Sequence, residues 1–305
     1  MKAAVLVPTL NAGPEWEDWM KAVLATGIDP ADVSIIDSGS NDGTVDQARD
    51  VGFNLQLIKQ EEFNHGGTRQ RAVNLLAGYE YAVFLTQDAI LSAPDSIDKI
   101  LSAFASERVA AVCGRQLPRE KAGFIERHAR LFNYPQRSTV NSIEDADVTG
   151  LKAAFFTNSF AAYRISSLLD IGGFPDNVIF GEDMFVATKL LKAGYKVAYA
   201  AEASVYHSHG YTLWQEMKRY FDMGVFHARE PWIRQELGGA EGEGVKFVVS
   251  ELKYVSKHEF WRVPEVLLRT LLRYTGFRLG LLEKKLPFWL KRKLAMNKTY
   301  FNRKC

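Results

Sequence analysis

The chain has 305 residues, enough for one large domain or for one domain with an extension, and enough to bury a substantial core. Hydrophobic residues make up 47% of the sequence and charged residues 24%, which is typical of a globular protein and excludes a disordered or fibrous one. No apolar stretch reaches the roughly 18 residues that a membrane-spanning helix needs, and residues 1–8 are too short for a signal peptide.

The two cysteines give no sign of a disulfide framework. Cys113 lies in an apolar run, and Cys305 is the last residue of the sequence. Unpaired cysteines are typical of a reducing compartment, so we expect a cytoplasmic protein.

The net charge of +2 hides an uneven distribution. From Arg262 to Cys305 there are 12 lysines and arginines against two acidic residues, whereas the rest of the chain has 26 basic and 34 acidic residues. A basic segment attached to an acidic body is information about binding partners and not about the fold.

The first part of the chain alternates short apolar strands with helices. The strands are expected at 3–7, 33–36, 55–58 and 81–85. The helices are expected at 15–25, 44–49 and 68–77, with Gly52 and Gly78 as stops after the second and the third. This alternation predicts an α/β fold with a mostly parallel, doubly wound sheet, in which ligands bind at the carboxyl ends of the strands.

The second part of the chain is more mixed and ends in helices. Strands are expected at 110–114, 153–163 and 196–200, helix and loop at 119–142, and helices at 183–193 and 214–226. The glycine-rich stretch 238–244 is the best linker in the chain, and helices broken at Pro264 and Pro287 follow it. We therefore predict one domain at 1–235 and a helical, basic C-terminal region at 236–305.

Polar side chains follow the first two strands at the predicted binding edge of the sheet. Thr9 and Asn11 follow the first strand, and Asp37 ends the second. An acidic side chain there commonly contacts a nucleoside, although a turn aspartate can also bond its own backbone. With Thr9 and Asn11 on the adjacent strand end, we favour a nucleoside. No Gly-x-Gly-x-x-Gly or P-loop lysine motif follows a strand, which argues against a dinucleotide cofactor or an NTPase.

Asp88 is the leading candidate for a metal ligand. It follows the apolar strand at 81–85, where a carboxylate can hold a hard divalent cation whose remaining positions are filled by phosphate oxygens. The alternative role of a helix cap is better served by Ser92 and Asp95, so we favour the metal.

Two histidines, His207 and His209, leave a later strand. Side chains spaced two residues apart on an extended chain point to opposite sides. We therefore expect only one of the two to bind a metal or a phosphate, unless the chain turns between them.

A glycine loop, Gly66 and Gly67, leads into the third helix. The free N–H groups at the start of that helix, together with Arg69, could receive an anion. The alternative is that Arg69 and Arg71 are solvated charges, and the sequence does not decide between the two interpretations.

Glu182 and Asp183 are adjacent carboxylates that open a helix after a Gly-Gly-Phe-Pro turn. Acidic residues are favoured in the first turn of any helix, so the pair alone is weak evidence. A general base must lie within hydrogen-bond reach of the proton that it takes, and the small polar Asn158 and Ser159 leave room for a hydroxyl nearby. Because the pair follows the polar clusters around Asp37 and Asp88 in the sequence, we expect it to supply that base.

Taken in order, these pieces resemble the family 2 glycosyltransferases of the GT-A fold, over about residues 3–230. The pieces are Pro8-Thr9-Leu10-Asn11, Asp37 to Thr44, Thr86-Gln87-Asp88-Ala89, Gly172-Gly173-Phe174 and Gly181-Glu182-Asp183. Three segments look like the bacterial rhamnosyltransferases that use dTDP-L-rhamnose in O-antigen and other surface polysaccharides. They are Phe63 to Arg69, Thr86 to Ala89 and His207-Ser208-His209.

The resemblance implies a role for each matching residue. Asp183 would deprotonate the acceptor hydroxyl for in-line attack on the anomeric carbon, with Glu182 in support, and inversion would give an α-L-rhamnoside. Asp88, with His207 as a further ligand, would hold Mg²⁺ or Mn²⁺ against the diphosphate. The expected substrate-binding residues are Thr9, Asn11, Asp37, Gly67, Arg69, Gln87, Asn158 and Ser159.

One departure from the family pattern concerns the metal. The usual Asp-x-Asp is reduced here to Thr86-Gln87-Asp88. Three outcomes are open: a weak metal site, a site completed by His207, or a site that depends on the bound nucleotide.

Leucine and aromatic residues interleave with arginine and lysine in the basic tail. They are Leu267, Leu268, Leu271, Leu272, Leu279, Leu281, Leu282, Phe288, Trp289 and Leu290. This composition is typical of an interfacial helix on an anionic membrane, where each basic residue adds about 1 kcal/mol. The alternative is an amphipathic helix packed on the catalytic domain. No recognition motif supports nucleic acid as a partner.

The resemblance implies a saccharide acceptor linked to polyprenyl diphosphate, and hence a peripheral protein on the cytoplasmic face of the inner membrane. Two other functions stay open. The same chemistry could use a UDP- or GDP-linked sugar, or the fold could serve a non-catalytic nucleotide-sugar-binding protein.

Overall fold

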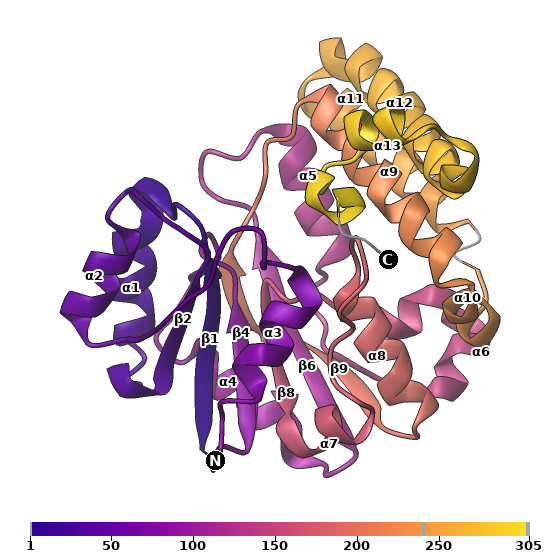
Figure 1. Ribbon diagram of the computed structural model, residues 1–305. Coiled ribbons are helices and arrows are strands. Elements are labelled where there is room, and N and C mark those ends of the chain that lie inside the picture. The colour runs from indigo at the N-terminus through magenta and orange to yellow at the C-terminus, as the bar shows by residue number, and fades with distance from the viewer. Residues whose placement is uncertain (1, 240–241, 303–305) are drawn as a thin grey trace.

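The computed structural model describes residues 2–239 and 242–302. Cys305 and two positions of the predicted linker, 240 and 241, lie outside the described residues. A central sheet has helices on both faces, and helices from the C-terminal third of the chain gather at one end of the molecule (Figure 1). The α/β architecture predicted from the sequence is confirmed.

The sheet has nine strands within the described part of the chain, eight of them in the order β3-β2-β1-β4-β8-β6-β9-β5. The strands are β1 Ala3–Thr9, β2 Val33–Asp37, β3 Asn54–Leu57, β4 Tyr81–Leu85, β5 Ile90–Leu91, β6 Val109–Leu117, β7 Thr139–Asn141, β8 Phe160–Arg164 and β9 Lys196–Tyr206. The first four predicted strands form the parallel half, β3-β2-β1-β4. In the other half β8 runs antiparallel between β4 and β6, and β9 is parallel to β6.

Strand register brings distant polar residues together at one edge of the sheet. Thr9 lies opposite Asp37 because β1 and β2 are parallel and in register at their carboxyl ends. The short strand β5 begins two residues after Asp88 and pairs Ile90 with Tyr206 at the end of β9. The end of β9 therefore delivers His207 beside Asp88.

The helices cover both faces of the sheet and form the C-terminal unit. They are α1 Trp16–Leu24, α2 Thr44–Val51, α3 His65–Val73, α4 Ser96–Ser102, α5 Phe124–Asn133, α6 Ala146–Thr149, α7 Ile165–Asp170, α8 Glu182–Lys192, α9 Leu213–Arg229, α10 Pro231–Leu237, α11 Glu243–His258, α12 Val263–Leu281 and α13 Phe288–Leu294. Pro264 lies in the first turn of α12 and Pro287 caps α13, so both prolines begin helices, as their fixed φ favours.

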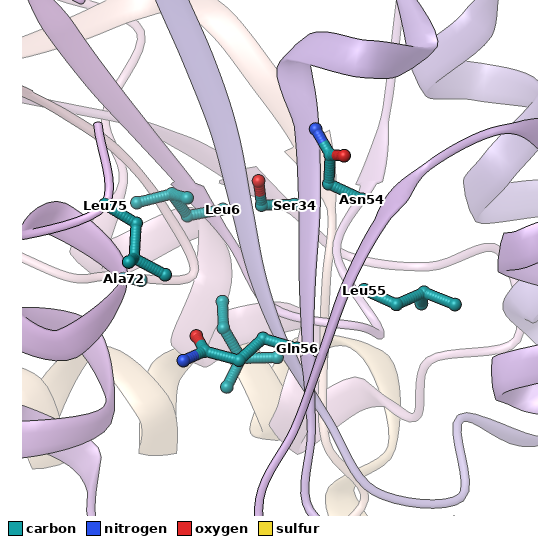
Figure 2. Close-up of a pocket in the computed structure, with 8 residues that line it drawn as sticks. Leu6, Ser34, Asn54, Leu55, Gln56, Ala72 and Leu75 are labelled. Carbon is teal, nitrogen blue, oxygen red and sulfur yellow. The ribbon is translucent and has the colours of Figure 1, made fainter. Parts of the chain in front are cut away.

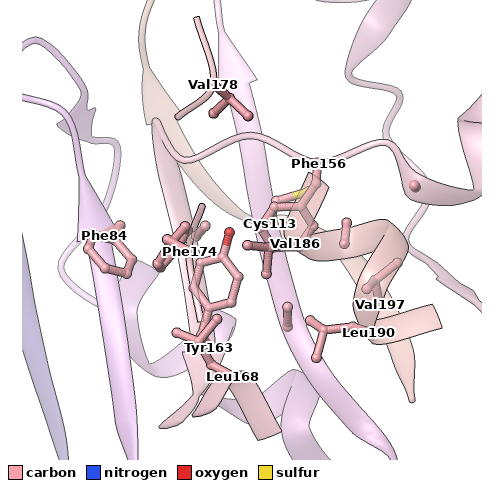
Figure 3. Close-up of a cluster of buried hydrophobic side chains, with 14 of the residues drawn as sticks. Phe84, Cys113, Phe156, Tyr163, Leu168, Phe174, Val178, Val186, Leu190 and Val197 are labelled. Carbon is pink, nitrogen blue, oxygen red and sulfur yellow. The ribbon is translucent and has the colours of Figure 1, made fainter. Parts of the chain in front are cut away.

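Two hydrophobic cores lie on opposite faces of the sheet. On one face the rings of Trp16 and Trp19 stack with their centroids 4.7 Å apart. On the other face Tyr163 packs edge-on against Phe84 and Phe174, with ring centroids 5.8 and 5.2 Å away (Figure 3). The hydroxyl of Tyr163 donates to Asn158 Oδ1 at 2.7 Å, which ties this core directly to the candidate site.

Two predicted elements differ from the structure near that site. The third helix begins at His65 instead of residue 68, because the Asn64 side chain accepts a hydrogen bond from the Gly67 N–H and caps it earlier. The strand expected at 153–163 begins only at Phe160. Residues 157–159 lie before the strand because the backbone and side chain of Asn158 turn toward the two carboxylates of α8.

The helix α12 packs closely along α9. A Cβ on Gly276 would lie 2.3 Å from the Met217 carbonyl oxygen, and one on Gly280 would lie 2.2 Å from the Phe221 carbonyl oxygen. Arg273 of α12 also forms ion pairs with Glu216 of α9, at 2.6 Å, and with Glu251 of α11, at 2.7 Å. The alternative considered for the basic tail, packing on the rest of the protein, therefore holds for one side of α12. No helix among the described residues has both the length and the apolarity to cross a membrane.

Candidate functional site

Asp37 is fully engaged by donors from its own turn and from β1. Its Oδ2 accepts from Thr9 Oγ1 at 2.8 Å, and its Oδ1 accepts from the backbone N–H groups of Gly39 and Ser40 at 2.9 and 2.8 Å. The side chain is buried. Asp37 therefore behaves as a turn aspartate that bonds its own backbone, which was the alternative to nucleoside binding. It shapes the strand end, and nucleoside contact by Thr9 and Asp37 stays a prediction.

The loop after β1 is held by two other predicted residues. Asn11 adopts a φ of 46°, a conformation that asparagine tolerates better than most residues, and its Oδ1 accepts from the Asn41 N–H at 2.9 Å. Gln87 spans the same loop, accepting from the Leu10 N–H at 2.8 Å and donating to the Leu10 carbonyl at 3.2 Å. Asn11 and Gln87 therefore fix the rim of the predicted nucleoside site.

Asp88, His207 and His209 form a cluster whose ligand atoms all lie within 4.8 Å of one another. His207 Nε2 lies 3.4 Å from Asp88 Oδ1, and His209 Nε2 lies 3.6 Å from Asp88 Oδ2. Both histidines reach this point because β9 ends at Tyr206 and the chain turns after it, which is the exception that the spacing argument allowed. The two imidazole rings meet edge to face at 4.5 Å.

A hydrogen-bond chain fixes the protonation of His207. Arg130 donates to Gln116 Oε1 at 2.7 Å, which identifies this atom as the amide oxygen. The same oxygen lies 2.9 Å from His207 Nδ1, so Nδ1 must carry the proton. Burial lowers the pKa of His207 and keeps the ring neutral. The lone pair of Nε2 therefore faces the Asp88 carboxylate, and two acceptors confront each other.

This donor set fits a divalent cation. A carboxylate and two neutral imidazoles directed at one point are a recurrent transition-metal arrangement, and a bound cation would remove the repulsion between Nε2 and Asp88. Burial acts to raise the pKa of Asp88, but the groups that surround it hold that pKa below its ordinary value, so the carboxylate is ionised at neutral pH. Burial also lowers the pKa of His209 to about 4, so all three groups are in the ligating form at neutral pH. Two nitrogen ligands favour Mn²⁺ over Mg²⁺, which prefers oxygen.

Arg119 is a site residue that the sequence did not single out. Its guanidinium donates to the Asp88 carbonyl and pairs with Glu15 at 2.5 Å. Its backbone N–H also donates to Ser208 Oγ at 3.3 Å, between the two histidines. Arg119 therefore holds together the two segments that carry the cluster.

Arg69 does not present its charge at the surface. It is buried, and its Nη1 forms an ion pair of 2.9 Å with Glu182 Oε1 and donates to the His65 carbonyl at 2.8 Å. The solvated alternative is therefore wrong for Arg69, although Arg71 is exposed and pairs with Glu62. Arg69 therefore neutralises the charge of the Glu182 carboxylate.

The glycine loop serves close packing and is not an open anion site. The Gly67 N–H already donates to the Asn64 side chain. A Cβ on Gly66 would lie 1.8 Å from the Pro175 carbonyl oxygen, and one on Gly67 would lie 2.6 Å from Asp176 Oδ1. The start of α3 is therefore covered by the loop at 173–176, which leads to Glu182 and Asp183.

The two adjacent carboxylates have different environments. Glu182 accepts from Arg69 and from Asn158 Nδ2, at 2.9 and 3.1 Å, and although burial acts to raise its pKa, the charge of Arg69 holds it below the ordinary value. Asp183 accepts the Met184 N–H at 2.8 Å, and burial together with the charge of Glu182 raises its pKa to about 7. Asp183 is thus placed to exchange a proton near neutral pH.

Residues 157–159 connect the carboxylates to the metal cluster. The Asn158 N–H donates to Asp183 Oδ2 at 3.4 Å, and the Ser159 carbonyl accepts from the Thr86 N–H at 3.2 Å, two residues before Asp88. Thr157 Oγ1 accepts from the Gln116 amide at 3.2 Å. One short segment therefore contacts Asp183, the end of the strand that precedes Asp88, and the hydrogen-bond partner of His207.

The loop before the carboxylates rests on residues far away in the sequence. Asn297 Nδ2 donates to the Ile179 carbonyl at 3.2 Å, and the Asn297 N–H donates to Asp222 of α9 at 2.9 Å. Gly181 has a φ of 75°, and a Cβ there would meet the Phe226 ring at 3.1 Å. The C-terminal segment and α9 thus seat the loop that carries Asp183, a role that the sequence did not indicate.

A cavity of about 210 Å³ lies away from these groups, between α3 and the parallel strands (Figure 2). It is lined by Leu6, Ser34, Ile36, Asn54, Leu55, Gln56, Ala72 and Leu75. No candidate site residue lines it, so the cavity does not bear on the chemistry.

The sequence is similar to known proteins over nearly its whole length. Residues 83–291 match glycosyl transferase family group 2. The chain is 45% identical over 303 residues to the O-antigen chain rhamnosyltransferase RfbN of Salmonella typhimurium, covering 99% of this chain and 96% of that protein. It is 46% identical over 299 residues to the O-antigen chain rhamnosyltransferase WbaN of Salmonella anatum, covering 98% and 95%.

Solved structures show the same fold. The mannosyltransferase PcManGT of Pyrobaculum calidifontis, in complex with GDP-Man and Mn²⁺, superposes with a TM-score of 0.58 at 19% identity, over 99% of this chain and 85% of that one. S. aureus TarS residues 1–349, in complex with UDP-GlcNAc, superposes with a TM-score of 0.54 at 15% identity, over 93% and 92%. The GT-A fold expected from the sequence is confirmed.

Proposed function

The chain belongs to glycosyl transferase family group 2 and is a glycosyltransferase, and from that premise we propose that it transfers L-rhamnose with inversion. The donor is dTDP-β-L-rhamnose, and the acceptor is a hydroxyl of a saccharide linked to polyprenyl diphosphate. Identity of 45–46% over nearly the full length to two O-antigen chain rhamnosyltransferases supports this assignment.

In this mechanism Asp183 is the general base. The carboxylate takes the proton of the acceptor hydroxyl while that oxygen attacks the anomeric carbon, and the bond to the diphosphate oxygen breaks on the opposite face. Glu182 stays ionised in its ion pair with Arg69 and keeps Asp183 basic. Asn158 orients Asp183 through its N–H and Glu182 through its amide.

Asp88, His207 and His209 are the residues that would hold the divalent cation, Mn²⁺ in preference to Mg²⁺. When bound, the cation neutralises charge that develops on the leaving diphosphate. Gln116 keeps His207 in the ligating tautomer, and Arg119 fixes the backbone of Asp88. The nucleoside end of the donor lies along Thr9, Asn11 and Gln87.

The observation that carries the proposal is the contrast between the two carboxylates. Arg69 fixes the charge of Glu182, while burial raises the pKa of Asp183 to about 7. A carboxyl group tuned in this way fits a general base, and this supports an enzyme over a non-catalytic sugar-binding protein.

The test is transfer of radiolabelled rhamnose from dTDP-rhamnose to a membrane extract that contains lipid-linked acceptor. Parallel reactions use UDP- and GDP-sugars. Transfer from dTDP-rhamnose alone supports the proposal. Transfer only from a UDP- or GDP-sugar would show that dTDP-rhamnose is not the donor. Nucleotide binding without any transfer would establish the binding-protein alternative.

We also propose that the C-terminal region, 236–305, lies against the cytoplasmic face of the inner membrane. One side of α12 packs on α9, while its other side leaves Leu267, Leu268 and Leu271 between 44% and 59% exposed. Trp261 and Trp289 are also exposed, at 63% and 65%. The exposed cations nearby are Lys284, Lys285, Arg292 and Lys293. Exposed apolar side chains beside exposed cations fit an anionic bilayer surface.

A further inference from the structure

Arg219 of α9 is a partly buried cation that the mechanism has not used. Its guanidinium lies 4.9 Å from the centroid of the Phe180 ring and 5.7 Å from the centroid of the Tyr211 ring. Two aromatic faces therefore hold the group in place, as arginine prefers.

The surroundings of Arg219 leave its charge unpaired. Among residues 2–239 and 242–302, it makes no hydrogen bond and no ion pair. The carboxylate of Asp222, one turn further along α9, is occupied by the backbone N–H groups of Met296 and Asn297 at 3.3 and 2.9 Å. The partly buried Arg119 and the buried Arg273, in contrast, have carboxylate partners at 2.5 to 2.7 Å.

The two rings that hold Arg219 belong to the two halves of the site. The Tyr211 ring lies 5.2 Å from the ring of His209, a member of the metal cluster. Phe180 lies in the loop immediately before Glu182 and Asp183. Arg219 therefore stands between the cation-binding cluster and the base.

In-line transfer constrains what can occupy this position. The sugar must lie between the base and the diphosphate, and the diphosphate must lie beside the metal cluster. A guanidinium between these groups faces the phosphate whose bond to the sugar breaks. Its planar set of donors matches phosphate oxygens, and developing negative charge is where fixed donors act most strongly.

We propose that Arg219 binds the sugar-bearing phosphate of the donor diphosphate and stabilises it as the leaving group. The proposal rests on the proposed function in taking the ligand to be a nucleoside diphosphate. A polyprenyl-diphosphate acceptor offers the same chemical group, so the experiment separates donor from acceptor.

The test compares Arg219→Met with the wild-type full-length protein by calorimetry in the presence of Mn²⁺. Methionine keeps an unbranched stem between the two rings and removes only the charge and donors. Binding of dTDP and UDP should weaken about 10- to 100-fold, as expected for loss of a charged hydrogen bond. Binding of dTMP and UMP, which lack the second phosphate, should change less than about 3-fold.

The matched control is Arg278→Met. Arg278 lies 5.9 Å from the centroid of the Tyr274 ring on the exposed side of α12, so it is also an arginine on an aromatic face. Its loss should leave all four affinities unchanged. Arg219→Lys should recover part of the diphosphate affinity but not the full turnover, because lysine lacks the planar pair of donors.

Equal affinity of wild type and Arg219→Met for dTDP and UDP would overturn the proposal. So would equal losses for mono- and diphosphates, which indicate a structural role, or an effect confined to the KM of the lipid-linked acceptor. These binding results do not depend on rhamnose transfer. A wild-type protein that binds diphosphates but uses no dTDP-rhamnose refutes the sugar assignment and leaves the Arg219 result interpretable.

Discussion

Arg69 and Glu182 form a buried ion pair, with Nη1 and Oε1 2.9 Å apart, and Glu182 immediately precedes Asp183 in the chain. The ion pair makes the protonation of Glu182 differ from that of the neighbouring Asp183. One is locked in its ionised form, and the other has a pKa of about 7. Divergent environments for adjacent acids are how a single site assigns different roles to chemically similar groups.

Asp183→Asn should slow sugar transfer strongly while leaving nucleotide binding intact. Asparagine keeps the shape and can still accept the Met184 N–H, but it cannot take a proton. The loss in kcat should be about 10²- to 10⁴-fold, the usual contribution of a general base. The control is Asp98→Asn, which removes an exposed carboxylate from the first turn of α4 and should have no effect. Normal turnover in Asp183→Asn would rule out this residue as the base.

The pH dependence of kcat/KM should follow the titration of Asp183. A base must be deprotonated to act, and burial and Glu182 raise its pKa to about 7. Activity should therefore be low at pH 5, rise tenfold per pH unit below about 7 and level off above it. A profile that is already flat between pH 5 and pH 8 would contradict this assignment.

Arg69→Met should destabilise the protein strongly. It leaves Glu182 buried without its cation, which typically costs 3–5 kcal/mol. The matched control is Arg71→Met in the same helix. Arg71 is 48% exposed in its pair with Glu62, so its loss should change the free energy of unfolding by less than about 0.5 kcal/mol. Chemical denaturation measures the free energy of unfolding of both variants. Similar losses in the two variants would show that the buried ion pair does not stabilise the protein more than the exposed one.

Gln116→Leu should weaken binding of Mn²⁺ about 10- to 100-fold, although Gln116 does not belong to the metal cluster. Leucine removes the oxygen that holds the proton on His207 Nδ1 and so frees Nε2 to take that proton. Electron paramagnetic resonance of free Mn²⁺ measures the affinity. Gln56→Leu, a partly buried glutamine on β3, should leave it unchanged. Unaltered affinity in Gln116→Leu would exclude the proposed control of the tautomer.

Replacing Trp261 and Trp289 by alanine should reduce sedimentation with anionic vesicles about tenfold or more. Both side chains are more than 60% exposed, so the fold should tolerate their loss. Leu57→Ala with Leu75→Ala is the control, because these side chains are each 63% exposed and lie in or beside β3, an edge strand of the sheet. Sedimentation that stays unchanged in the tryptophan variant would place membrane contact elsewhere.

Local patterns in the sequence were sufficient to predict much of the fold. The strand at 81–85 has the predicted bounds because a run of five apolar residues between polar neighbours leaves little choice. The ends of the first two strands were located to within two residues, since the apolar runs stop at Val7 and Ile36 while β1 and β2 continue to Thr9 and Asp37. Family membership and glycosyl transfer, inferred from the order of these pieces, are confirmed.

Pairings between distant residues could not be predicted in the same way. Arg69 was considered as an anion receptor because nothing in the sequence places Glu182 opposite it. His209 was set aside because alternation along a strand does not reveal where the strand ends. Gln116, Arg219 and Asn297 carry no motif, and their roles arise only from contacts made across the fold.

The contact of Asn297 with the Ile179 carbonyl has a consequence for the order in which the site is completed. The ribosome makes every predicted metal ligand and both carboxylates before it reaches position 297. During synthesis the chain therefore holds the whole set of reactive groups before it holds the residue that seats their loop. Shortened chains that stop before Asn297 would contain all the candidate site residues but would lack the contact that positions the loop before Asp183.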